Sequence, residues 1–149
     1  MTARSIPNGA WIFVGDGRKA VVFQNHGDET MPDFRVVEFH ERRSPGTRDQ
    51  GSDRPGRAYS SGGRRSAVEQ TDWHHVDEVR FVSEIADLLY QAAHTGAFDK
   101  LVLVAPPKVL GQLRDELHQE VTKRVVGEVG KDLVNMEVAE VERLLTGRG

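Results

Sequence analysis

The first forty residues consist of short runs of apolar, β-branched and aromatic residues separated by turn signals. Strands are expected at residues 10–15, 19–24 and 34–40. Asp16-Gly17 lies between the first two strands and Asn-His-Gly-Asp at 25–28 follows the second, and both are typical of tight turns. Because no segment between these strands is long enough for a helix, the pattern predicts an antiparallel meander.

From residue 76 onwards the apolar positions recur every three or four residues, which is typical of one face of a helix. They are Val76, Val79, Phe81, Val82, Ile85, Leu88, Leu89, Ala92 and Ala93. We expect a helix over 76–96, with Asp72 as a candidate N-cap and Gly96 as a candidate stop. Residues 101–105 are apolar at every position, which indicates a strand that is covered on both faces.

Pro106-Pro107 ends that strand and opens a helix predicted at 108–119, because proline near a helix start costs no hydrogen bond. Its apolar face consists of Val109, Leu110, Leu113 and Leu117. Residues 123–129 fit a fifth strand, although 118–127 could instead extend the helix. The last helix is expected at 136–146, with Val138, Val141, Leu144 and Leu145 facing inward.

The predicted order is three strands, helix, strand, helix, strand, helix. Alternation in the second half favours strands four and five running parallel to strand one. We therefore expect a single α/β domain over 1–149, with three layers and a mixed five-stranded sheet. The third strand is the expected exposed edge, where two copies could pair, but the sequence leaves the oligomeric state open.

Composition excludes several classes of protein. The chain has 149 residues and no cysteine. It is long enough to bury a core, and it cannot be a disulfide scaffold, a Cys-ligated zinc module, an iron–sulfur protein or a thiol enzyme. The apolar runs are too short to cross a bilayer and the first residues lack the apolar stretch of a secretory signal. We expect a cytoplasmic protein with no membrane association and no cofactor.

The formal net charge of −3 conceals one basic segment. Residues 41–65 carry seven arginines against three acids, a net charge of +4, which leaves −7 for the rest of the chain. Glycine, proline and serine are abundant there and apolar residues nearly absent, so we predict a long mobile loop at 41–73. Arginine forks match phosphates. The candidate RNA contacts are Arg42, Arg43, Arg48, Arg54, Arg57, Arg64 and Arg65, with Gly62 and Gly63 shaping the tip.

Several stretches resemble the small bacterial "host attachment" proteins, which are grouped with bacterial relatives of the archaeo-eukaryotic peptide-chain release factors. They are Trp-Ile-Phe-Val-Gly-Asp-Gly at 11–17, Asp-Arg-Pro-Gly-Arg at 53–57, Phe-Val-Ser-Glu-Ile-Ala at 81–86, Gly-Ala-Phe-Asp-Lys-Leu-Val-Leu-Val-Ala-Pro-Pro at 96–107, Leu-Gly-Gln-Leu-Arg at 110–114 and Lys-Asp-Leu at 131–133. The resemblance covers nearly the whole chain and implies a ribonuclease-H-like fold, like the middle domain of those factors.

In that domain a long loop after the third strand ends in a Gly-Gly-Gln motif, which places water for ester hydrolysis in the ribosomal peptidyl-transferase centre. The present chain has Gly62-Gly63-Arg64 in the corresponding segment. Arg64 stands at the glutamine position, so the resemblance implies ribosome or RNA binding and puts hydrolysis in doubt.

Two other functions remain open. The first is a non-catalytic module linked to host attachment, whose arginine-rich loop docks on an acidic protein. The second is a metal-dependent nuclease using Asp16, Glu38, Asp53 and Glu78. A metal site at His74-His75 with Asp72, Asp77 and Glu78 is disfavoured, because no second ligand cluster follows. Pro106-Pro107 marks either a rigid turn or a crevice at a strand's carboxyl end.

Overall fold

A computed structural model describes residues 6–42 and 67–146, with the backbone alone for 67–76. Its elements follow the predicted order: β1 (Trp11–Gly15), β2 (Lys19–Asn25), β3 (Phe34–Glu41), α3 (Ala67–His94), β4 (Leu101–Val104), α4 (Pro107–Glu116), α5 (Gln119–Thr122), β5 (Val125–Val129) and α6 (Val138–Thr146). The sheet order is β3-β2-β1-β4-β5. β1, β2 and β3 pair antiparallel, and β4 is parallel to both β1 and β5. The predicted mixed five-stranded α/β fold is confirmed.

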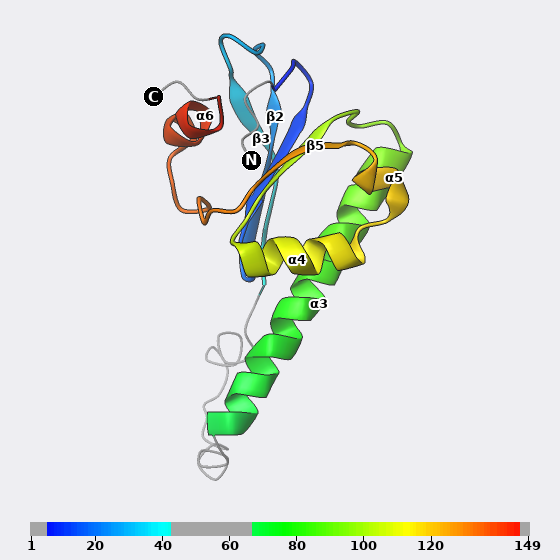
Figure 1. The fold of residues 1–149 in the computed structure, drawn as a ribbon, viewed down its shortest axis with the longest axis vertical. Helices are drawn as coiled ribbons and strands as arrows, with labels where there is room; N and C mark the ends of the chain where they lie inside the picture. Colours follow the sequence, from blue (N-terminus) through cyan, green and yellow to red (C-terminus); the bar gives the residue numbers. More distant parts are fainter. Residues whose placement is uncertain (1–5, 43–66, 147–149) are drawn as a thin grey trace, which may run out of the picture.

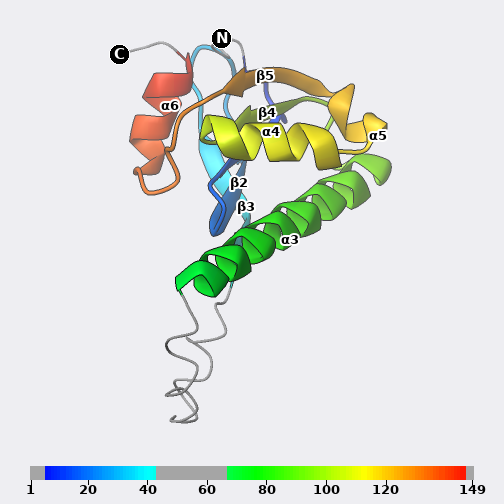
Figure 2. The same cartoon turned by 60° about the horizontal axis from the view of Figure 1, so that its bottom comes forward.

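Helices cover both faces of the sheet, which gives three layers (Figures 1 and 2). On one face α3 and α4 pack on Trp11, Phe13, Leu101 and Leu103, and on the other α6 packs on the alternate residues of the same strands. All four residues of β4 are buried, as their uniformly apolar character predicts. This burial supplies the main stabilisation of the fold.

The beginning of α3 corrects the predicted loop. β3 continues through Glu41 and α3 begins at Ala67, so the segment between them is shorter than 41–73, and Asp72 lies inside the helix rather than at its N-cap. Figure 1 shows that the first turns of α3 project beyond the sheet. Helical turns that do not cover a sheet need no apolar stripe. The spacing of apolar residues therefore gave no helix signal before residue 76.

The end of α3 matches its sequence signal. Gly96 has a positive φ of 79°. Its N–H donates to the Ala93 carbonyl, and the Ala97 N–H donates to the Ala92 carbonyl. These two bonds make a Schellman motif, for which glycine is the preferred residue.

The second half of the chain departs from prediction at two places. α4 ends at Glu116 rather than 119, because Leu117 takes an extended conformation and the His118 side chain caps the short helix α5. β5 then follows as a strand, which settles the alternative of a longer helix. In α6 only Val141 and Leu145 are buried, whereas Val138 and Leu144 are 39% and 40% exposed.

Within the described residues, no helix is both long and apolar enough to span a membrane.

Candidate functional site

Arg42 anchors the point at which the arginine-rich segment leaves β3. Its backbone N–H donates to the Arg18 carbonyl, which extends the β2–β3 pairing by one residue. Its Nη1 lies 3.6 Å from Asp77 Oδ2 on α3, and the two side chains are only 14% and 13% exposed. Arg42, one of the candidate RNA contacts, is thus held by an ion pair within the domain.

A hollow of about 230 Å³ lies beside this ion pair. It is lined by Glu41, Arg42, Asp77, Arg80, Phe81 and Glu84. The Nε and Nη1 atoms of Arg42 are buried without a hydrogen-bond partner. Three acids against two arginines make the hollow unfavourable for a phosphate, so Arg42 is better suited to hold β3 on α3 than to bind an anion.

The β1–β2 hairpin docks next to this anchor. Asp16 Oδ1 accepts hydrogen bonds from the N–H groups of Arg18 and Lys19, both at 2.8 Å, as in an Asx turn. Glu78 of α3 fills the space beside Gly17. Its Oε1 lies 3.4 Å from both Lys108 Nζ and Gln112 Nε2 of α4. The hairpin, α3 and α4 therefore meet at the end of the domain where the arginine-rich segment begins.

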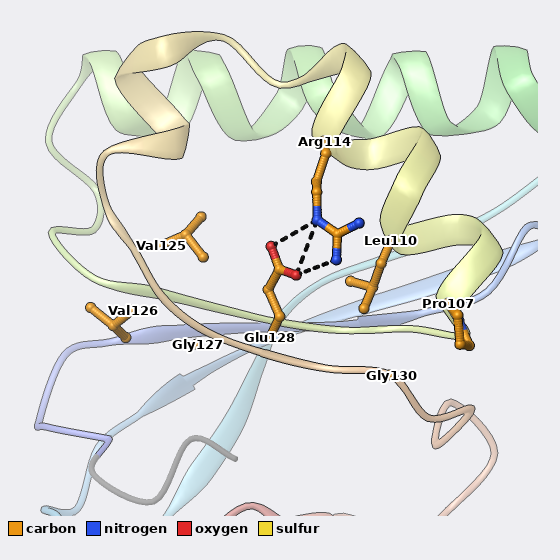
Figure 3. A pocket seen from close by; sticks show the side chains of 8 residues that line it. All are labelled: Pro107, Leu110, Arg114, Val125, Val126, Gly127, Glu128 and Gly130. Atoms are coloured by element: carbon orange, nitrogen blue, oxygen red, sulfur yellow. Dashed lines mark hydrogen bonds and ion pairs between the residues drawn. The ribbon is translucent and has the colours of Figure 1, made fainter. Parts of the chain in front are cut away.

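A second concave site lies between α4 and β5 (Figure 3). Its volume is about 540 Å³, and it is lined by Pro107, Leu110 and Arg114 from α4 and by Val125, Val126, Gly127, Glu128 and Gly130 from β5 and its end. The chain leaves β4 toward α4 on one face and leaves β5 toward α6 on the other. One end of this crevice, at Pro107 and Gly130, lies at the carboxyl ends of β4 and β5, and the rest of it follows β5 alongside α4. Pro107 therefore both begins α4 and borders a crevice.

One ion pair crosses this crevice between its two ends (Figure 3). Arg114 donates from Nη2 to Glu128 Oε1 at 2.6 Å and from Nε to both carboxylate oxygens at 3.2 and 3.3 Å. The hydrogen bonds that Arg114 donates to Glu128, followed by the negative charge of that carboxylate, raise the pKa of Arg114 above its ordinary value. The pair ties α4 to β5.

The model of bacterial archaeo-eukaryotic release factor family 12 matches residues 9–145. The chain belongs to this family. The predicted resemblance to release-factor relatives is therefore confirmed, and it extends from the start of β1 to the last turn of α6.

Two individual proteins are also similar to this chain. The chain is 41% identical over 51 residues to the uncharacterized protein RP470 of Rickettsia prowazekii (strain Madrid E), a match that covers 34% of each protein. A solved chain described as an archaeal protein aligns with 93% of this chain and 36% of its own length, at 14% identity and a TM-score of 0.45. The chain thus spans about a third of each of these relatives.

Most of the predicted RNA contacts of this family member lie outside the described residues. They are Arg43, Arg48, Arg54, Arg57, Gly62, Gly63, Arg64 and Arg65. Of the four candidate nuclease acids, Asp53 lies outside the described residues. The other three do not form one cluster with His or further acids: Asp16 holds the hairpin, Glu38 binds His40 at 3.0 Å, and Glu78 binds α4. Among the described residues no three His, Cys, Asp or Glu side chains gather as metal ligands would.

The crevice between α4 and β5 was only half visible in the sequence. The proline pair Pro106-Pro107, which follows an apolar strand, indicated the end of the crevice that lies beside Gly130. The Arg114–Glu128 pair joins residues 14 positions apart on different elements. No local pattern signals such a pair, because it depends on how α4 packs against β5.

Proposed function

We propose that this protein acts in translation by binding ribosomal RNA through the arginine-rich segment 41–65. Membership of a release-factor family over residues 9–145 is the observation that carries the proposal. Two further features support it. The segment holds a net charge of +4 in a chain whose remainder is −7, and it joins β3 to α3, where the resemblance expects the loop that enters the ribosome.

Arg42 has a different role in this proposal from the other six arginines. Its partly buried ion pair with Asp77 fixes the first arginine of the segment against α3. The remaining arginines supply the phosphate contacts, and Gly62-Gly63 lets the backbone approach the RNA. Because Arg64 stands at the glutamine position, binding occurs without efficient ester hydrolysis.

Co-sedimentation with purified ribosomes across a salt series tests this function. Arg57, Arg64 and Arg65 are replaced together by glutamine. The matched control replaces the exposed cations Arg35, Lys100 and Arg143 by glutamine, which changes the net charge equally. We expect the first variant to bind more weakly and with a salt slope lower by about 3, one unit for each lost phosphate contact. The control should sediment like the wild type.

Equal binding by both variants would contradict the proposal. Affinity capture with and without nuclease then separates RNA binding from docking on an acidic protein, since partners that survive the nuclease favour the protein-interaction function. A peptidyl-tRNA hydrolysis assay on wild type and Arg64→Gln examines the chemistry. We expect no release by the wild type, and release by the variant would show that the missing glutamine alone prevents it.

A further inference from the structure

The first turns of α3 extend beyond the sheet that the rest of the helix covers (Figure 1). Among the described side chains of α3, the first that joins the core is that of Phe81. At about 1.5 Å per residue, Ala67 lies about 16 Å along the helix axis from Glu78. A tilt of about 10° would therefore move Ala67 by about 3 Å, the full length of a hydrogen bond. The direction of α3 thus decides where its first residue lies.

Two consecutive acids, Asp77 and Glu78, lie on the turn of α3 that precedes the core. Asp77 Oδ2 is 3.6 Å from Arg42 Nη1, at the end of β3. Glu78 contacts α4 instead, because its Oε1 lies 3.4 Å from both Lys108 Nζ and Gln112 Nε2. Neighbouring residues on a helix point about 100° apart. The two acids therefore hold this turn of α3 in two different directions.

Glu78 is confined more closely than its neighbour. Its side chain is 22% exposed, and a Cβ built on Gly17 of the β1–β2 hairpin would overlap its carboxylate. The carboxylate consequently lies between the hairpin on one part of its surface and α4 on another. A sideways movement of this turn of α3 must displace one of these two elements.

We propose that Asp77 and Glu78 brace the projecting end of α3, and that this bracing positions Arg64 and Arg65 for RNA. Arg65 precedes Ala67 by two residues, so a displacement of Ala67 displaces these arginines as well. The RNA partner rests on the proposed function, whereas the bracing rests on the contacts of the two acids. Glu78 acts through the helix and is a positioning residue that does not itself contact RNA.

The bracing is measurable without ribosomes. Because the chain has no cysteine, nitroxide labels can be attached at Glu69→Cys near the start of α3 and at Ala139→Cys, an exposed position of α6. Glu78→Ala should shift or broaden the distance distribution from double electron–electron resonance by about 3 Å. Asp87→Ala removes an exposed acid of the same helix and should leave the distribution unchanged.

A second variant removes the contact from the other side. Lys108→Met combined with Gln112→Leu eliminates both α4 partners of Glu78 and nearly preserves the size of their side chains. It should change the distance as Glu78→Ala does. Glu78→Gln retains the bulk and a hydrogen-bonding group for Gln112, so it should stay close to the wild type. Unchanged distances in both Glu78→Ala and the double variant would overturn the bracing, whether or not the protein binds ribosomes.

Co-sedimentation with ribosomes tests the positioning of the arginines. Removal of an acid by itself favours RNA binding, so weaker binding by Glu78→Ala is not a charge effect. We expect Glu78→Ala to bind several-fold more weakly than Asp87→Ala, with an unchanged salt slope because the arginines are the same. Equal affinities would overturn the positioning role. A wild type that does not bind would instead overturn the proposed function, while the measured distances still decide the bracing.

Discussion

Glu78 on α3 occupies the space that a side chain at position 17 would need. A Cβ built on Gly17 would overlap the Glu78 carboxylate and its neighbouring carbons. The positive φ angles of the described glycines belong to Gly9 and Gly96, so the need for glycine at position 17 is steric and not conformational. This close approach fixes how the β1–β2 hairpin sits on α3, while Glu78 also contacts Lys108 and Gln112 on α4.

Gly17→Ala should lower the free energy of unfolding by about 1 kcal/mol, at the low end of the usual cost of overpacking, because the atoms that must move are the flexible end of the Glu78 side chain. The methyl group would displace Glu78 and weaken its contacts with α4. Urea unfolding of the variant, of Glu78→Ala and of the double variant measures the coupling. The alanine at position 17 should cost clearly less when Glu78 is already absent. An equal cost in both backgrounds would show that Glu78 is not the obstacle.

Gly111→Ala is the comparison variant for Gly17→Ala, because the added methyl group enters open space. Gly111 lies inside α4, and a Cβ there would meet no atom within 4 Å. Alanine is preferred over glycine in a helix by about 1 kcal/mol. We expect a gain of that size in the same unfolding assay. A loss of stability instead would mean that another group approaches the helix backbone at this point.

Gly96→Ala should destabilise the domain by about 1–2 kcal/mol, because an L side chain in the left-handed region costs that much. Space is available, since a Cβ at Gly96 meets nothing within 4 Å, so the cost is conformational. Gly96→Asn should cost less, because asparagine tolerates this region better. Thermal unfolding compares the two variants, and equal effects would argue against the conformational explanation.

Local patterns were sufficient wherever a residue's role depended on its neighbours in sequence. The apolar run at 101–105 predicted β4 as a doubly covered strand, and Gly96 predicted the end of α3. The patterns failed where tertiary contacts decided. The Phe34 N–H donates to Glu142 Oε2 of α6 at 2.8 Å, a link across 108 residues that no periodicity announces.

The arginine-rich segment shows the same difference between what neighbours in sequence reveal and what tertiary contacts decide. A run of arginines is visible in sequence, and it predicted a phosphate-binding role for all seven alike. The partner of one of them is not visible. Arg42 becomes an anchor only because β3 ends beside Asp77 on a helix that begins after the arginine-rich segment. Sequence spacing cannot separate Arg42 from the other six arginines, whereas its ion pair with Asp77 does.

Arg42 and Arg43 should therefore behave oppositely when each is replaced by glutamine. Arg42→Gln removes the positive charge beside Asp77, whose side chain is 13% exposed, and we expect a loss of about 2 kcal/mol in unfolding free energy, below the cost of breaking a fully buried pair. The salt slope of ribosome binding should stay unchanged. Arg43→Gln should leave stability within about 0.5 kcal/mol and lower the salt slope by about 1.

A double variant shows whether the pair itself is responsible. Asp77→Asn combined with Arg42→Gln removes both charges, so it should be no less stable than Arg42→Gln alone. If instead Arg42→Gln lowers the salt slope while stability is retained, Arg42 contacts phosphate and the anchor role is wrong. Because unfolding and salt dependence are measured on the same protein samples, the two roles give opposite results and one set of variants decides between them.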